Sequence, residues 1–340
     1  MTEHIIDVRD LTVDFSTDNG IVHAVRGVTL EVNEGEIVGL VGESGSGKSV
    51  TMYAIMGLMS ENGRITGGEI SVDGQPIAVK DFPDRRAYDK AMDELRGNRL
   101  AMIFQDPMTF LNPTKTIGSQ IMEVIKNHNS CSNEEAKKRA LTLMAQVGIP
   151  SPERRFRQYP HEFSGGMRQR IIIAIALANK PRVMIADEPT TALDVTIQAQ
   201  VLELIRDLSR QEGSSVILIT HDLGVVATLC DYVYVMYGGK IVESGTDEEI
   251  FYDARHPYTK GLLSCVTDPE DPDRALIPIP GSPPDLLAPP AGCPFVDRCD
   301  KAMKICKEQM PVFTQFTENH KSACWLNEKE ALSSGEVRDE

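Results

Sequence analysis

The sequence predicts an α/β fold with a mainly parallel core sheet, an antiparallel β subdomain, a helical insertion and an irregular C-terminal extension that contains cysteines. A glycine-rich loop at residues 42–49 stands between a short apolar strand, 36–41, and a segment, 50–59, that can continue as a helix. Apolar runs at 182–187 and 216–220 are each followed by a helix-forming segment. Such alternation of strands and helices is typical of parallel sheets.

The beginning of the chain predicts an antiparallel β pair. Residues 5–15 and 22–32 alternate apolar and polar side chains on either side of Asp18-Asn19-Gly20, a typical turn sequence. Residues 67–72, followed by Asp73-Gly74, indicate a further strand and a tight turn. The other elements expected in this part of the chain are helices at 83–97, 165–179, 195–211 and 222–230 and strands at 99–104 and 232–243.

A helical insertion is expected at residues 106–163, where the α/β pattern is interrupted. Ser132 and Glu135 have the spacing of a capping box, and the helix that they open should run to Val147 before a glycine ends it. A second helix is expected at 117–127.

The composition excludes several classes of protein. The chain has 340 residues, enough for two or three domains, and 41% of them are apolar. Its net charge of −15 argues against a nucleic-acid-binding protein, which needs a basic face. The longest apolar run, Ile171 to Ala178, is too short to span a membrane, and the N-terminus lacks the pattern of a signal peptide. We therefore expect a cytoplasmic protein that reaches a membrane only through a partner.

Residues 42–49 fit the phosphate-binding pattern G-x-x-x-x-G-K-[ST] through Gly42, Gly47, Lys48 and Ser49. Glycines let backbone N–H groups approach an anion closely, and the following helix presents its positive N-terminus to the same anion. Lys48 is expected to reach the β- and γ-phosphates and Ser49 to hold Mg²⁺. The alternative is a chance match in a Gly/Ser loop, which the setting between a strand and a helix argues against.

Two carboxylates, Asp187 and Glu188, end the apolar strand at 182–187. A carboxylate delivered beside the phosphate loop can hold Mg²⁺, and one residue further a second carboxylate can polarise an attacking water. Two solvated acids at the end of a strand are the alternative. The phosphate loop earlier in the chain favours the catalytic interpretation.

Ser164-Gly165-Gly166 precedes a very apolar helix. A hydroxyl, exposed N–H groups and the helix dipole can together bind an anion. The local pattern alone favours the simpler alternative, a serine N-cap after a tight turn.

Taken in order, the motifs of this chain resemble those of the nucleotide-binding subunit of an ABC transporter. They are the loop at 42–49, Gln105, Ser164 to Gly166, Asp187-Glu188, Ala192-Leu193-Asp194 and His221. The resemblance implies a P-loop ABC ATPase fold, with Gln105 as a sensor of the γ-phosphate and Mg²⁺ near the contact with the membrane partner. It further implies that Glu188 is the general base, that His221 contacts the γ-phosphate, and that Ser164 to Gly166 bind the ATP held by the other subunit.

The resemblance also implies which residues hold ATP and Mg²⁺. Phe15 stands where family members place an aromatic residue that stacks on adenine; an ordinary core residue at the end of a strand is the alternative. The expected ATP-binding set is Phe15, Gly42, Ser44, Gly45, Ser46, Gly47, Lys48, Ser49 and Val50, with Asp194 in the D-loop and Ser49, Gln105 and Asp187 at Mg²⁺.

One branch of the family is particularly similar to this chain. Where most members have glutamine after Ser-Gly-Gly, this chain has Met167, which cannot donate that hydrogen bond. The sequence around it, like the stretches at 104–113 and 292–299, resembles the D-type ATPases of dipeptide and oligopeptide importers. This implies a second ATPase subunit, often an F-type paralogue, two transmembrane permease subunits and an extracytoplasmic peptide-binding protein. It also implies a peripheral location on the cytoplasmic face of the inner membrane.

Three parts of the chain are expected from these observations. An ABC nucleotide-binding domain should occupy residues 1–255. Proline and glycine dominate 269–294, so residues 256–327 should form a Pro-rich extension. The charged end, 328–340, should be a flexible tail.

Four of the seven cysteines, Cys293, Cys299, Cys306 and Cys324, lie in the extension. In a reducing compartment such a cluster suggests a metal rather than disulfides. Its gaps of 5, 6 and 17 residues are wider than those of most zinc fingers, whereas iron–sulfur clusters tolerate wide loops. The resemblance to the importer branch implies a [4Fe–4S] cluster; zinc and no metal remain the alternatives.

Two other functions compete with peptide import. A related ATPase could serve a different solute, such as nickel, glutathione or murein peptides, because solute choice resides in other subunits. A soluble ABC ATPase that acts on nucleic acid or ribosomes is the other class. The acidic composition, the single cassette and the absence of heptads between Gln105 and Ser164 disfavour it.

Overall fold

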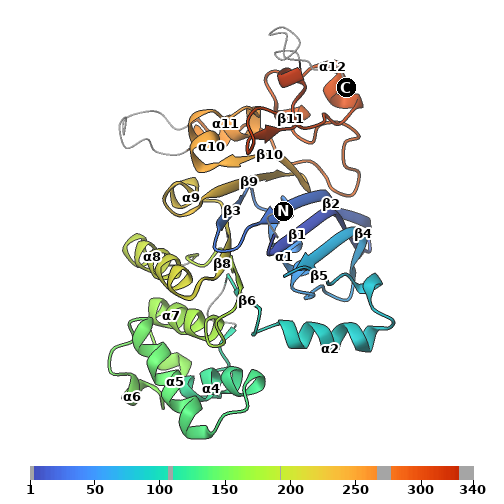
Figure 1. The fold of residues 1–340 in the computed structure, drawn as a ribbon. Helices are drawn as coiled ribbons and strands as arrows, with labels where there is room; N and C mark the ends of the chain where they lie inside the picture. Colours follow the sequence, from blue (N-terminus) through green and yellow to red (C-terminus); the bar gives the residue numbers. More distant parts are fainter. Residues whose placement is uncertain (1–3, 106–109, 192, 266–276, 329–340) are drawn as a thin grey trace. The chain divides into compact units, whose positions relative to one another are not determined.

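The computed structural model describes residues 4–105, 110–191, 193–265 and 277–328. The chain divides into two compact units (Figure 1). The first is built from Met1–Ile6, Val32–Ile37 and Ser71–Ile219, and the second from Asp7–Glu31, Val38–Ile70 and Thr220–Glu340. Among the described residues, no helix combines the length and the apolar character that crossing a membrane requires.

The core of the first unit is a parallel sheet. Strands β6 (Leu100–Ile103), β7 (Val183–Asp187) and β8 (Ser215–Thr220) are buried along their whole length and lie in the order β8-β7-β6. Parallel strands covered on both faces need continuous apolar runs, which is why the sequence identifies them so clearly. The short strand β5 (Gln75–Pro76) pairs with Ser71 and Val72 instead.

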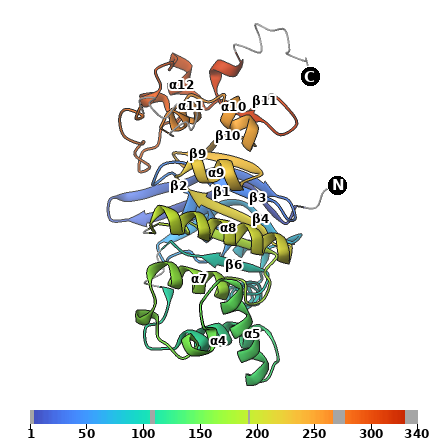
Figure 2. The same ribbon diagram turned by 90° about the vertical axis from the view of Figure 1, so that its left-hand side faces the viewer.

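The first unit also contains helices. They are α2 (Arg85–Leu95), α4 (Ile117–His128), α5 (Asn133–Gln146), α6 (Pro152–Arg155), α7 (Gly165–Ala176) and α8 (Val195–Glu212), with the single 3₁₀ turns η1 (Val79–Asp81) and η2 (Pro160–Glu162). Helix α7 packs against β6. Helices α4, α5 and α7 lie side by side (Figure 2). The expected capping box opens α5: Ser132 Oγ accepts from Glu135 N at 3.2 Å, and the Glu135 carboxylate accepts from Ser132 N at 2.8 Å.

The second unit contains both kinds of sheet. Strands β1 (Ile6–Thr17) and β2 (Gly20–Val32) form the expected hairpin, and β1 also neighbours β4 (Gly63–Val72). Strand β3 (Ile37–Val41) pairs in parallel with β9 (Tyr232–Tyr237). Helix α1 (Lys48–Ile55) follows β3, and α9 (Leu223–Leu229) precedes β9. The α/β fold predicted from the sequence is therefore confirmed.

The C-terminal part of the second unit contains a two-residue strand, β12 (Lys321–Ser322), that the sequence does not reveal. It pairs antiparallel with β10 (Lys240–Thr246), whose other edge pairs antiparallel with β9. So short and polar a segment has no apolar alternation, and only its pairing partner makes it a strand. The remaining elements are α10 (Asp247–Tyr252), α11 (Pro257–Leu263), η3 (Val296–Arg298), α12 (Lys304–Glu308) and β11 (Thr314–Gln315).

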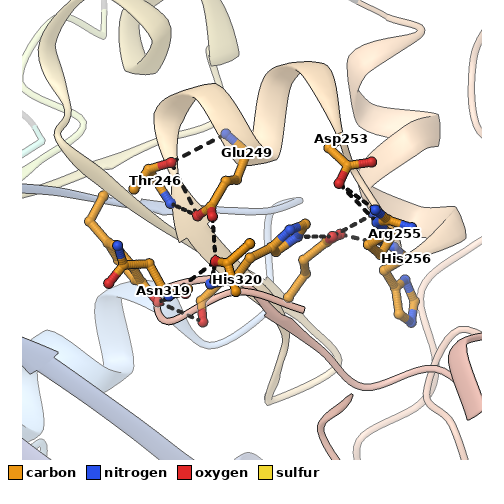
Figure 3. A network of polar contacts seen from close by, with 11 residues as sticks. Thr246, Glu249, Asp253, Arg255, His256, Asn319 and His320 are labelled. Carbon is orange, nitrogen blue, oxygen red and sulfur yellow. Dashed lines mark hydrogen bonds and ion pairs between the residues drawn. The ribbon is translucent and has the colours of Figure 1, made fainter. Parts of the chain in front are cut away.

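A buried carboxylate on β10, Glu243, anchors this C-terminal part. Figure 3 labels three of its partners, Arg255, His256 and His320. Glu243 accepts hydrogen bonds from the backbone N–H groups of Arg255, at 2.6 Å, and His256, at 3.0 Å, and pairs with His320 Nε2 at 2.9 Å. Burial alone would raise the pKa of Glu243, but these hydrogen bonds, together with the nearby Thr259 side chain, outweigh it and hold the pKa below its usual value. Segments distant in sequence are thereby fixed to one strand.

Candidate functional site

The phosphate loop of the second unit connects β3 to α1 and requires glycine at two positions. Gly42 has φ 150°, and a Cβ there would lie 2.1 Å from the carbonyl oxygen of Met236. Gly47 has φ 103°, and a Cβ there would lie 2.6 Å from the carbonyl oxygen of Ala24. The loop is therefore packed against two other strands, so that neither glycine can be replaced without moving backbone.

Lys48 is the first residue of α1, and its side chain is folded into the loop. It is buried, and its Nζ donates to the carbonyl oxygens of Gly42, at 2.7 Å, and Glu43, at 2.9 Å. The backbone of the loop thus holds the ammonium group beside the place where a phosphate would bind. Of the other predicted ATP-binding residues here, Ser44 and Gly45 are exposed, Ser46 is buried, and Ser49 and Val50 are half-buried.

Helix α1 presents its N-terminus without a side-chain cap. Gly47 occupies the N-cap position in the left-handed conformation, and the first turn of α1, which lies wholly within the described residues, carries no acidic side chain. Uncapped N–H groups and the positive end of the helix dipole favour a bound anion. This arrangement can bind phosphate.

The ring of Phe15 lies against Gly63, the first residue of β4. A Cβ at Gly63 would lie 2.7 Å from Phe15 Cε1, so the ring covers the glycine closely. Phe15 is half-buried. Its stacking on adenine remains a prediction.

The first unit brings together two of the predicted catalytic residues. Gln105 Nε2 donates to Glu188 Oε2 at 2.8 Å, and Thr191 Oγ1 donates to the same oxygen at 3.0 Å. Strand β7 delivers this carboxylate: Asp187, its last residue, is buried, and Glu188 follows with φ 44°. A non-glycine residue in the left-handed region is strained, a feature that is concentrated at functional sites.

The backbone of Glu188 is fixed by the neighbouring strand, since its N–H donates to the carbonyl of Ile219 at 2.9 Å. His221, the predicted γ-phosphate contact, belongs to the second unit and is exposed. It precedes Asp222, whose carboxylate caps α9 by accepting from Gly224 N at 2.9 Å.

Ser164 caps helix α7, as the local sequence pattern favours. Its Oγ accepts from Met167 N at 3.4 Å. Gly166 packs closely on α8, because a Cβ there would lie 2.8 Å from Ile197 Cγ2, whereas a Cβ at Gly165 would meet only an ordinary contact at 3.8 Å. Asp194 caps α8 through Ile197 N at 3.0 Å. Binding of a nucleotide by this group remains a prediction; Ala192, next to it in sequence, lies outside the described residues.

All four cysteines of the extension line one small cavity, together with His256, Phe295 and Trp325. The thiols of Cys293, Cys299, Cys306 and Cys324 are free. Burial raises the pKa of Cys293 to about 12, and the neighbouring thiols contribute to the rise. Within the described residues, no three or more His, Cys, Asp or Glu side chains are placed to hold a metal ion. The structure therefore gathers the predicted ligands at one cavity without forming a coordination sphere.

The sequence does not reveal the partners of Glu43, the second residue of the phosphate loop. Its carboxylate is paired with Arg298 at 2.6 Å, and its N–H donates to the hydroxyl of Tyr258 at 2.9 Å. One signal could have revealed this pair: a carboxylate in a loop that binds anions is unfavourable unless a cation neutralises it.

Most of the chain is similar to known proteins. Residues 25–191 match the family described as ABC transporter, and residues 242–306 match the one described as oligopeptide/dipeptide transporter, C-terminal region. The dipeptide transport ATP-binding protein DppD of Bacillus subtilis is 49% identical over 341 residues, covering 99% of this chain and 100% of the relative. OppD, the oligopeptide transport ATP-binding protein of Escherichia coli, is 45% identical, covering 96% and 95%.

Solved structures give the same result for the fold. A dimeric bacterial ABC transporter cassette is 28% identical, with a TM-score of 0.62, and covers 74% of this chain and 99% of its own. The post-hydrolysis state of an ATP-binding cassette, a dimer bound to ADP and phosphate, is 27% identical, with a TM-score of 0.61 and the same coverage.

Proposed function

Since this chain belongs to the ABC transporter family of ATP-binding proteins, we propose that it is the ATP-hydrolysing subunit of an importer of dipeptides or oligopeptides. The similarity over nearly the whole chain to relatives named for peptide transport carries this proposal. The match of residues 242–306 to a C-terminal region named for the same transporters supports it from a second part of the chain.

The phosphate loop binds the nucleotide in this proposal. Backbone N–H groups of the loop, other than that of Glu43, and those at the start of α1 hold the phosphates, while Lys48 neutralises part of their charge. Ser49, Gln105 and Asp187 hold Mg²⁺, an ion that prefers oxygen ligands and that stabilises the charge of the phosphates.

Glu188 acts as general base on the attacking water. Its hydrogen bond from Gln105 and its fixed backbone support this role, because a base must be oriented as well as ionised. His221 contacts the γ-phosphate, and Phe15 stacks on adenine.

A second ATPase subunit pairs with this chain, and Ser164, Gly165 and Gly166 of this chain bind the ATP held by that subunit. Asp194 lies in the D-loop. The dimeric cassettes among the similar structures support a paired arrangement. We propose an F-type paralogue as the second subunit, two permease subunits as the membrane partners, and an extracytoplasmic peptide-binding protein that supplies the solute. The complex would place this chain on the cytoplasmic face of the inner membrane.

We further propose a [4Fe–4S] cluster at Cys293, Cys299, Cys306 and Cys324. Their convergence on one cavity and their free thiols support it, and the cluster would crosslink an extension with little regular structure. The purified protein should contain about four iron and four sulfide per chain by chemical assay. Stoichiometric zinc without iron would contradict the proposal, as would a protein with no metal.

The importer proposal is tested with the proposed membrane partners. Co-expressed with two permeases and a second ATPase of the peptide-importer type from the same genome, this chain should co-purify as a complex. In proteoliposomes, ATP hydrolysis should rise when peptide-loaded binding protein is added. A rise with nickel, glutathione or murein peptides instead would assign another solute, and failure to assemble with any permease would reject the importer.

A further inference from the structure

Glu43 is held on three sides, although the phosphate chemistry of its loop does not require its side chain. Its N–H donates to Tyr258, its carbonyl accepts from Lys48, and its carboxylate meets the guanidinium of Arg298. The last contact is bidentate, with Nη1 at 2.6 Å from Oε2 and Nη2 at 3.0 Å from Oε1. Two parallel charge-assisted hydrogen bonds fix both the position and the plane of a carboxylate.

Arg298 is itself fixed by the extension. Its Nε donates to the carbonyl of Pro280 at 2.8 Å, its Nη2 to that of Ile279 at 3.2 Å and its Nη1 to the hydroxyl of Tyr237 at 3.0 Å. Its side chain is only 6% exposed, against 26% for Glu43. The hydrogen bond to Glu43 is the main reason that the pKa of Arg298 is raised. A guanidinium so anchored is a rigid support for the loop.

Tyr258 supports the same residue from α11. It is fully buried. The centroid of its ring lies 4.4 Å from that of the Tyr237 ring and 5.3 Å from that of the Phe295 ring. Both contacts to Glu43 therefore come from the chain beyond residue 255, where the next residue after Arg298 is one of the four cysteines of the cavity.

We propose that Arg298 is a positioning residue for the phosphate loop: through Glu43 it holds the loop in the conformation that binds nucleotide, so that the C-terminal extension sets nucleotide affinity. The inference rests on the proposed binding of ATP at this loop. Because a coupling between two sites acts in both directions, bound nucleotide should also stabilise the segment around Arg298.

The first experiment measures the dissociation constant of MgATP by direct titration of the full chain. Arg298→Gln and Glu43→Gln should each weaken binding about tenfold, and the double variant should be no weaker than either single one. Saturated turnover of Arg298→Gln in the assembled complex should be unchanged, which separates positioning from chemistry. Lys304→Gln, which removes a cation that is 91% exposed, is the control.

Two results would overturn the proposal. One is an Arg298→Gln variant that binds MgATP as tightly as the wild-type protein. The other is a double variant whose loss of MgATP affinity is the product of the two single losses. If Arg298→Gln does not fold, Tyr258→Phe replaces it, since it keeps the ring and removes only the hydroxyl that accepts from Glu43; this variant should also bind MgATP more weakly, and unchanged affinity would count against the proposal.

Hydrogen exchange gives a second, independent readout. Nucleotide should slow exchange at residues 293–299 in the wild-type protein and not in Arg298→Gln or Glu43→Gln; equal protection in all three would refute the coupling. A wild-type chain that binds no nucleotide at all would instead reject the proposed function, so the two failures are distinguishable.

Discussion

The side-chain amide of Gln105 donates a hydrogen bond of 2.8 Å to the carboxylate of Glu188, across 83 positions of sequence. Strand β6 ends at Ile103, two residues before Gln105, and the parallel strand β7 ends directly before Glu188, so the sheet register brings the two residues to the same edge. A carboxylate oriented in this way, with Thr191 on the same oxygen, can act on a water molecule only along a defined direction.

Glu188→Gln should nearly abolish hydrolysis and leave binding intact. The amide oxygen can still accept from Gln105 and Thr191, so the local structure is kept, but it cannot take a proton. We expect the turnover number of the assembled complex to fall by at least about 100-fold with an unchanged dissociation constant for MgATP. The control is Glu203→Gln, which replaces an exposed carboxylate on α8 that pairs with Arg206, and this variant should hydrolyse ATP normally. Normal turnover in Glu188→Gln would remove it as the base.

Lys48→Ala should act on binding itself. The substitution removes a buried ammonium that donates to the carbonyls of Gly42 and Glu43, and it takes a positive charge away from the phosphates. Hydrogen bonds of charged groups contribute about 1.5–3 kcal/mol, so MgATP affinity should fall about 10- to 100-fold. Equilibrium titration of the isolated chain measures this, with Lys304→Ala as the control. Unchanged affinity would mean that the nucleotide does not contact Lys48.

Gly166→Ala should destabilise the packing of α7 on α8, whereas Gly165→Ala should not. The new methyl group at Gly166 would lie 2.8 Å from Ile197 Cγ2, which is too close. The methyl group at Gly165 would lie 3.8 Å from its nearest neighbour, which is an ordinary contact distance. The two variants share the same gain in helix propensity, so their difference isolates the clash, which we expect to cost about 1–3 kcal/mol. Denaturant unfolding of the isolated chain measures it. Equal stability of the two variants would refute the close contact.

His256→Asn should make stability less sensitive to acid. Burial lowers the pKa of His256 to about 4, from an ordinary 6.5, and its Nδ1 accepts from Tyr258 N at 3.0 Å. The unfolded chain therefore binds a proton that the folded chain refuses. The contribution of His256 to stability is full above pH 6.5 and is lost as the pH falls toward 4, by about 2 kcal/mol at pH 5. Asparagine can accept the same N–H and does not titrate.

Unfolding of wild-type protein and His256→Asn at pH 7 and pH 5 tests this prediction. The wild-type protein should lose about 2 kcal/mol more than the variant over this interval. Because both proteins keep Glu243, its own titration cancels in the comparison. The same loss in both proteins would show that His256 accepts a proton in the folded state.

The elements with a strong local signal were predictable. The capping box of Ser132 and Glu135, the hairpin of β1 and β2 and the buried strands β7 and β8 follow from patterns that neighbouring residues complete by themselves. Strand β12 was not predictable, because two polar residues become a strand only when Glu243 and Ser244 pair with them. The same holds for the anchoring of His320 on Glu243, which joins residues 77 positions apart.

The sequence alone determined that this chain belongs to the nucleotide-binding proteins and predicted which glycines, lysine and carboxylates serve that binding, because motif chemistry depends on residue types at fixed short spacing. Only the tertiary structure decided what holds those residues in place. Gln105 orients Glu188, and Arg298 and Tyr258 hold Glu43, through contacts that cross long stretches of chain. Such contacts depend on which side chains the packed strands and helices bring together, and no local pattern in the sequence names these distant partners.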